Sequence, residues 1–233
     1  MAHMAKLSSA HLIETRRKIL NSTKTLLVNN GYKKTTIRKI AEDSGVLIGS
    51  IYYIFKNKED IFQSMILAMV RNCIRKIEKQ YPNESPAFRY AAVCALELKE
   101  MEAAPIIRDV YREGYDSTTT FEHMVTQFTL LAEHIFKGSP YETDRETYYQ
   151  HTLLIKGGMR ACIGELYFEK EHDAAKSRES LLQMALTLFG VPQAERDEVV
   201  KRVAGNDGLW LKIANELATL PIEGGDEPVE MEE

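Results

Sequence analysis

The sequence predicts an all-α protein with two domains, and three observations support this prediction. Apolar residues recur at intervals of three and four along most of the 233-residue chain, and the apolar stretches are bounded by capping residues, Gly or Pro. No segment shows the alternation of apolar and polar residues that a half-buried strand requires. We expect an N-terminal helix-turn-helix domain at 5–56, a larger helical domain at 57–221 and an acidic, disordered tail at 222–233.

The first helix is expected to begin at Ser8 or Ser9, either of which can cap it. Its pattern ends at the run Asn29-Asn30-Gly31, which supplies a C-terminal stop. The inward positions at helical spacing are Ile19, Leu20, Thr23, Leu26 and Leu27.

Two short helices follow. Thr35 or Thr36 can cap the first of them, Gly45 can end it, and the second begins near 47–49. The inward positions are Ile37, Ile40 and Ala41 in the first and Ile51 and Phe55 in the second. Two short helices that are joined by a tight turn and packed on a longer helix form the helix-turn-helix, whose second short helix enters the major groove of DNA.

A long amphipathic helix is predicted from Asn57 to about Gln80, because Asn57 can cap it and Glu59 and Asp60 suit the positive helix N-terminus. Further helices are expected at 85–102, 104–114, 118–137, 143–171, 175–190, 193–204 and 207–219. Together these helices are long enough to bury a core of ordinary size.

Charge is distributed unevenly along the chain. The first 80 residues hold 15 Lys and Arg against 6 Asp and Glu, whereas the remaining 153 residues hold 15 against 28. One end of the molecule can therefore face a polyanion while the other repels it, which is typical of a nucleic-acid-binding protein.

Several protein classes are disfavoured by composition. No apolar run is long enough for a membrane span, and three separated cysteines provide neither a disulfide framework nor a metal-binding pair. No H-E-x-x-H, G-x-S-x-G or phosphate-loop motif is present, so we expect no enzyme activity, no metal and no cofactor. The initial MAHM lacks signal-peptide features and looks like a cloning remnant, and we expect a cytoplasmic protein.

The run from Gly31 to Ile61, GYKKTTIRKIAEDSGVLIGSIYYIFKNKEDI, resembles the DNA-binding signature of TetR-type transcriptional regulators without a gap. The match extends over about 50 residues, and the rest of the chain resembles the family only in its plan. The resemblance implies a homodimeric repressor that binds a near-palindromic DNA operator through the helix-turn-helix and is released by a small effector bound in the larger domain.

The family's DNA contacts can be placed on this sequence. The resemblance implies phosphate contacts near the start of the second helix and at the start of the fourth, and a base contact from a guanidinium. Ile48 is added from its own chemistry, because an apolar side chain can contact thymine methyl groups. The predicted DNA-binding residues are Thr35, Thr36, Arg38, Ile48, Gly49, Ser50, Tyr52, Tyr53 and Lys58.

Three positions depart from the family's pattern. Leu47 stands where Ser or Thr usually caps the recognition helix, Ile48 stands where a polar residue is common, and Ile54 replaces a histidine that commonly contacts phosphate. We expect the cap to be lost or supplied otherwise, and we expect Ile54 to lie at the edge of the core.

Residues 143–171 are apolar around most of the predicted helix and carry a stripe of small residues. Such a helix must be covered on nearly all sides, either by a second subunit or within one subunit. The residues expected at a four-helix dimer interface are Gly157, Ala161, Gly164, Leu182, Ala185 and Phe189.

The effector site is expected among apolar stripes that carry occasional polar groups, with a hydrophobic effector as the suitable ligand. The candidate residues are Tyr90, Cys94, Glu97, Met101, Tyr111, Tyr115, Phe128 and His151. Each can alternatively belong to an ordinary core, and Glu97 can be an ordinary solvated carboxylate.

A DNA-bound adaptor of the same fold, regulated by a protein partner, is the alternative function. A cavity of several hundred Å3 would favour the effector, and a filled core with an exposed apolar patch would favour the adaptor.

Overall fold

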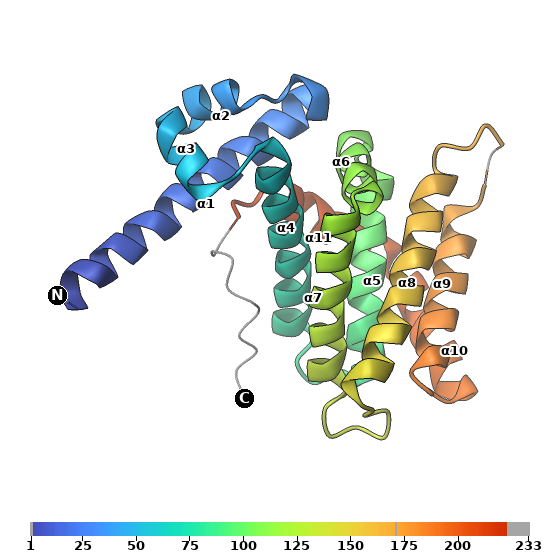
Figure 1. Ribbon diagram of the computed structural model, residues 1–233. Helices are drawn as coiled ribbons and strands as arrows, with labels where there is room; N and C mark the ends of the chain where they lie inside the picture. The colour runs from blue at the N-terminus through green and yellow to red at the C-terminus, as the bar shows by residue number, and fades with distance from the viewer. Residues whose placement is uncertain (1, 171, 223–233) are drawn as a thin grey trace.

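The computed structural model describes residues 2–170 and 172–222, and within these residues every regular element is a helix (Figure 1). The all-α prediction is therefore confirmed. The bounds are α1 Ala2–Lys34, α2 Ile37–Ser44, α3 Ile48–Ile54, α4 Lys58–Gln80, α5 Pro86–Ala103, α6 Pro105–Asp116, α7 Thr118–Phe136, α8 Arg145–Glu165, α9 Ala174–Leu188, α10 Gln193–Ala204 and α11 Asp207–Thr219. No helix in this described part is long and apolar enough to cross a membrane.

Helices α1, α2 and α3 form a small head at one end of the molecule, and the other helices form the body (Figure 1). Ile40, Ile51 and Phe55 are buried in the head against Ile19 and Leu20 of α1, as their spacing predicts. The head continues directly into α4, the first helix of the body.

Local capping fixes the ends of the head's helices. The Thr36 side chain accepts a hydrogen bond from the Lys39 amide at the start of α2, and Asn57 accepts one from the Asp60 amide at the start of α4. Gly45 ends α2 in the left-handed conformation at φ 68°, which turns the chain into α3. Leu47 provides no side-chain cap for α3, so the predicted loss of that cap is confirmed.

Helix α5 is the centre of the body, because it packs against α4 and against each of α6 to α11. Pro86 stands in the first turn of α5, where its missing amide costs no hydrogen bond. A helix with neighbours on all sides must be largely apolar, and the Glu97 and Glu100 side chains are the buried exceptions in α5.

Three predicted boundaries differ from the structure. Helix α1 begins at Ala2 rather than at Ser8 or Ser9, although Gly31, at φ 72°, does interrupt it as predicted. The helix predicted at 143–171 ends at Glu165, because turns follow. Ile222, the first residue of the predicted tail, is fully buried, whereas 223–233 lie outside the described residues.

Gly45→Ala is expected to lower the free energy of unfolding by about 1 kcal/mol, because an L side chain is strained at a positive φ. Gly49→Ala is the matched control, since Gly49 lies in α3 with no atom within 4 Å of an added Cβ. Urea unfolding of both variants checks this expectation. An equal loss of stability in the control would contradict it.

Candidate functional site

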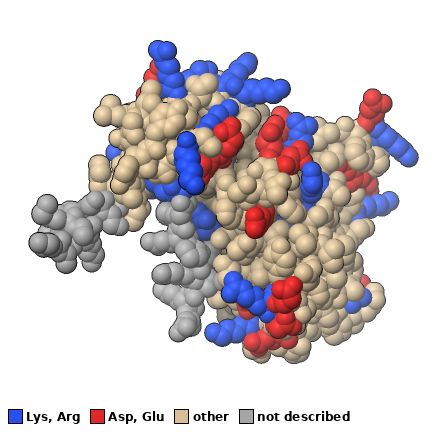
Figure 2. Space-filling view, in the orientation of Figure 1, with Lys and Arg blue, Asp and Glu red and all other residues tan. Residues whose placement is uncertain are grey.

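One face of the head presents most of the predicted DNA-binding residues to solvent. The side chain of Tyr53 is 82% exposed and that of Tyr52 is 55% exposed, and Ile48, Gly49 and Ser50 lie on the same short helix. Ile51 and Phe55 hold the opposite side of α3 in the core of the head. Lysine and arginine side chains project from the outer edge of the head (Figure 2). The geometry suits a helix that enters a groove lined by phosphates.

The start of α2 contributes one threonine rather than two. Thr36 is exposed beside the first turn of α2, and Arg38 is exposed in an ion pair with Glu42 at 3.0 Å that solvent weakens. Thr35 is fully buried, and its hydroxyl donates to the Gly31 carbonyl at 3.0 Å. Its predicted phosphate contact is therefore wrong, because the hydroxyl is buried and already donates a hydrogen bond within the head.

Lys58 lies at the start of α4 but is folded back onto the head. Its Nζ donates to the Tyr32 carbonyl at 2.8 Å and stands 3.8 Å from the centroid of the Tyr32 ring. Partial burial lowers the pKa of Lys58. A phosphate contact therefore requires this side chain to leave Tyr32. Ile54 packs against the core, as predicted.

A buried ion pair stands in the interior of the body. Lys156 of α8 donates to Glu97 of α5 at 2.6 Å, and both side chains are at most 1% exposed. The hydroxyl of Tyr115 on α6 donates to the other carboxylate oxygen at 3.0 Å and accepts from Lys156 at 3.3 Å. The Lys156 Nζ also stands 3.1 Å from the centroid of the Phe128 ring of α7. Four helices thus converge on one pair of opposite charges.

A second acidic group lies one turn further along α5. Glu100 is 5% exposed and accepts a hydrogen bond from the Tyr111 hydroxyl at 3.2 Å. Burial raises the pKa of Glu100 to about 8, so this group is mainly protonated at neutral pH. Burial likewise raises the pKa of Cys73, which contacts the same carboxyl.

Two buried hydroxyls lie at the other end of the α5 face. Tyr90 and Thr152 are fully buried, and neither hydroxyl has a hydrogen-bond partner of good geometry. Burial raises the pKa of Tyr90, and the nearby Thr152 hydroxyl partly opposes this rise. The ring of His151 packs edge-on against Phe189 at 5.5 Å between centroids, and burial lowers the pKa of this histidine.

The structure therefore brings together part of the predicted effector site. Glu97, Tyr115 and Phe128 meet around Lys156, while Cys94 and Met101 are fully buried on α5. Glu97 is not solvated, and it already has a cation. Sequence reasoning missed Lys156 and Thr152. The signal for Lys156 was a single lysine in the apolar run LLIKGGM.

Comparisons with known proteins agree with the geometry of the head. Residues 19–65 match the family model described as "Bacterial regulatory proteins, tetR family". This match covers α2 and α3 and the adjoining parts of α1 and α4. The head of this chain is therefore similar to the DNA-binding part of TetR-family regulators.

Curated relatives match only parts of the chain. The Fatty acid metabolism regulator protein of Bacillus subtilis is 33% identical over 30% of this chain and 36% of its own length. The HTH-type transcriptional repressor BepR of Brucella suis is 32% identical over 39% of this chain and 46% of its own length. The regulator AcrR of Shigella flexneri is 29% identical over 57% of this chain and 53% of its own length. The chain thus spans about half the length or less of these relatives, which are transcriptional regulators.

Two solved structures have a fold similar to that of this chain, including the helices of the body. RolR in complex with resorcinol superimposes with a TM-score of 0.63 at 16% identity, covering 81% of this chain and 94% of that one. The fatty acid degradation regulator FadR of Bacillus halodurans gives a TM-score of 0.50 at 17% identity, covering 76% and 98%. At these identities the likeness is one of fold.

The stripe of small residues lies on the outer side of α8. Gly157 and Ala161 are exposed, and nothing stands within 4 Å of a Cβ added at Gly157 or Gly164. Leu154 on the same helix is 57% exposed. This face of α8 is uncovered in the single chain, whereas Ile155 and Met159 on the opposite face are buried.

Three residues predicted at the dimer interface instead point inward. Leu182, Ala185 and Phe189 of α9 are at most 4% exposed. The Phe189 ring packs on Tyr90 at 4.8 Å and on Phe136 at 4.7 Å between centroids. These three residues fill the core of their own subunit, and the large apolar residue that α9 exposes is Met184.

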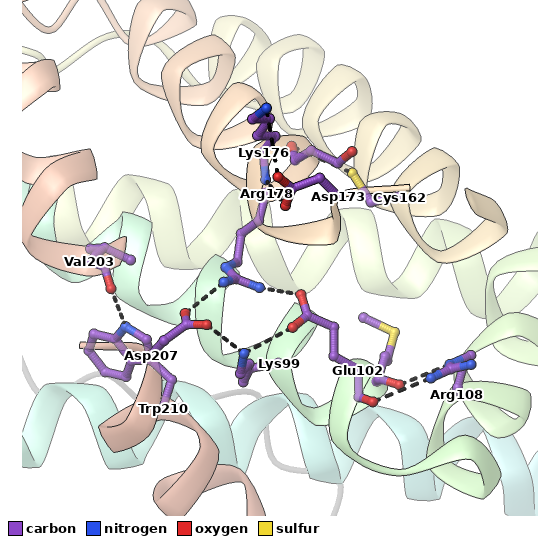
Figure 3. A network of polar contacts seen from close by, with 12 residues as sticks. Lys99, Glu102, Arg108, Cys162, Asp173, Lys176, Arg178, Val203, Asp207 and Trp210 are labelled. Atoms are coloured by element: carbon purple, nitrogen blue, oxygen red, sulfur yellow. Dashed lines mark hydrogen bonds and ion pairs between the residues drawn. The ribbon is translucent and has the colours of Figure 1, made fainter. Parts of the chain in front are cut away.

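Helix α11 joins the body to the head. At its start, Asp207 accepts from Arg178 of α9 at 2.6 Å and from Lys99 of α5 at 2.6 Å, and Glu102 of α5 pairs with both cations (Figure 3). These four alternating charges connect α5, α9 and α11.

The far end of α11 is held by α1. The Lys24 Nζ donates to the carbonyls of Leu217 and Leu220 at 2.7 Å and 2.6 Å, and Asn21 exchanges two hydrogen bonds with the backbone of Ile222. A cation at a helix C-terminus also suits the helix dipole. Helix α11 therefore connects the body to α1, the first helix of the head.

Lys24→Met is expected to lower the free energy of unfolding by about 1–3 kcal/mol, because two carbonyls of the α11 end lose their charged donor. Lys18→Met is the control, since Lys18 is an exposed lysine on the same helix. Equal stability of the two variants in urea would contradict the role assigned to Lys24.

Proposed function

We propose that the protein is a homodimeric transcriptional repressor that binds a near-palindromic DNA operator and is released by a small molecule bound in the body. DNA binding is supported above all by the exposed face of α3, which lies in a head that matches the TetR family model. Because such a repressor must reach the DNA, the proposal also places the protein in the cytoplasm. The curated relatives include repressors, which supports the sign of the regulation.

Within this proposal, most contacts of the head go to the DNA backbone. Tyr52, Tyr53 and Thr36 supply neutral hydrogen-bond donors for phosphate, and Lys58 supplies a charge when it leaves Tyr32. Arg38 and Ser50 can reach base edges, and Ile48 can contact thymine methyl groups. Gly49 lets the backbone of α3 approach the DNA.

Tyr53→Phe is expected to weaken binding to an operator fragment, selected from genomic DNA, by about fivefold through the loss of one hydrogen bond of about 1 kcal/mol. The salt dependence should stay unchanged, because no charge is removed. Tyr149→Phe, an exposed tyrosine of the body, is the control. Fluorescence anisotropy measures both variants. Unchanged affinity of Tyr53→Phe would remove this residue from the interface.

The uncovered face of α8 is the surface we propose for dimerisation. The dimer must place its two recognition helices about 34 Å apart, one helical turn of DNA. Small residues at Gly157 and Ala161, with Gly164 beyond them, allow a second helix to approach closely. Apolar Leu154 and Met184 beside them supply area to bury.

Ala161→Glu is expected to produce a monomer at micromolar concentration, because each interface would bury two unpaired carboxylates. Ala194→Glu, an equivalent change at an exposed position of α10, should stay dimeric. Sedimentation velocity distinguishes the two. A monomeric wild-type protein would contradict the dimer altogether.

The buried polar groups around Glu97 support a small-molecule effector. The solved relative RolR was crystallised with resorcinol, and one curated relative is a regulator of fatty acid metabolism. An effector switches DNA binding only if it binds the two arrangements of the head with different affinity. The link from α5 through α11 to Lys24 provides a route from the body to the head.

The packed interior favours the adaptor as a second candidate function. A cavity between α5, α8 and α9 holds only about 10 Å3, while the larger hollows of about 700 Å3, 500 Å3 and 270 Å3 lie at or beside the junction of the head with the body. Operator release by a small molecule, measured with purified protein alone, favours the repressor. Release that requires a second protein favours the adaptor.

A further inference from the structure

The hydroxyl of Tyr115 occupies an unusual position in the core. It donates to Glu97 at 3.0 Å and accepts from Lys156 at 3.3 Å, so one phenol is held between a buried anion and a buried cation. The cluster thus already binds a phenolic hydroxyl, and that hydroxyl belongs to the chain itself. A hydroxyl from another molecule could make the same two hydrogen bonds.

The charges of the cluster restrict which molecules can enter. Glu97 and Lys156 are at most 1% exposed and compensate each other. An added carboxylate or ammonium would leave one buried charge without a partner, which is strongly unfavourable. A neutral molecule preserves the balance.

The surroundings of the cluster favour a ligand with an aromatic ring or another compact apolar group. The Phe128 ring stands against Lys156, and the flexible Met159 side chain places its sulfur 3.8 Å from the Tyr115 hydroxyl. Methionine adapts its shape more readily than branched residues, so Met159 is the neighbour best suited to yield to a ligand.

A second polar group has a place along the same helices. Thr152 lies one helical turn, about 6 Å, before Lys156 on α8, and its hydroxyl lies near that of Tyr90 without a hydrogen bond of good geometry. A ligand atom that bonds to these buried hydroxyls would give them better hydrogen bonds than they make to each other.

We infer that Glu97 and Lys156 form the recognition site for a neutral phenol or alcohol, whose hydroxyl replaces that of Tyr115 and whose ring lies toward Tyr90 and Thr152. This inference rests on the proposed function, because the same site serves as the effector site there. It adds the chemical class of the effector and assigns Tyr115 as its internal competitor.

Direct binding tests this inference with three probes of similar size: 4-methylphenol, benzoate and benzylammonium at neutral pH. Calorimetry and thermal shift of the wild-type chain should show saturable binding of 4-methylphenol alone. Glu97→Gln leaves Lys156 as an unpaired cation, so this variant should gain benzoate binding. Equal binding of benzoate and 4-methylphenol by the wild type would overturn the inference.

Tyr115→Phe is the decisive variant, because it keeps the ring and removes the competing hydroxyl. It should bind 4-methylphenol about tenfold more tightly than the wild type, since both charged hydrogen-bond partners are vacated. Tyr111 lies on the same helix as Tyr115, and its buried hydroxyl is bonded to Glu100. Tyr111→Phe removes this hydroxyl and should leave the affinity for 4-methylphenol unchanged. Unchanged or weaker binding by Tyr115→Phe, or no binding of 4-methylphenol by any variant, would also overturn the inference.

The same samples keep the inference separate from the proposed function. Binding of 4-methylphenol with the predicted variant pattern, but without any operator binding, would support the site and refute the repressor. Operator binding that is released by compounds insensitive to Glu97→Gln and Tyr115→Phe would support the repressor and refute the site.

Discussion

The ion pair between Glu97 and Lys156 constrains the whole body. Two charges without solvent contact are unfavourable unless each finds its partner and its remaining hydrogen bonds. Those requirements are met by Tyr115 from α6 and the Phe128 ring from α7, so helices α5, α6, α7 and α8 must keep one relative position. Removing the partner of either charge would leave the other charge buried and unpaired.

The same central helix carries this constraint to the head. Beyond Glu97, α5 presents Lys99 and Glu102 to Arg178 and Asp207, which fix the start of α11. The end of α11 is bonded to Lys24 in α1. The head is therefore held by the body through the continuous chain into α4, through the packing of α1 on α4 and α6, and through α11.

Much of this fold could be predicted from the sequence, because its signals are local. Thr36, Gly45 and Asn57 act on backbone groups within a few residues, and each was correctly placed. Long-range partners were harder to predict. Glu97 and Lys156 are 59 residues apart, so the carboxylate could only be judged alone, where a solvated role looked favourable. An apolar stripe likewise shows that Leu182 and Phe189 must be covered, but it does not tell which helix covers them.

We propose that the charged pair in the body and the Lys24 contact in the head belong to one coupled unit. A double-mutant cycle on operator affinity tests it most directly, combining Lys24→Met with the neutral pair Glu97→Leu and Lys156→Met. The account predicts that the two changes are non-additive by more than about 0.5 kcal/mol, although they lie on different helices. Additive effects within about 0.5 kcal/mol would contradict the claim.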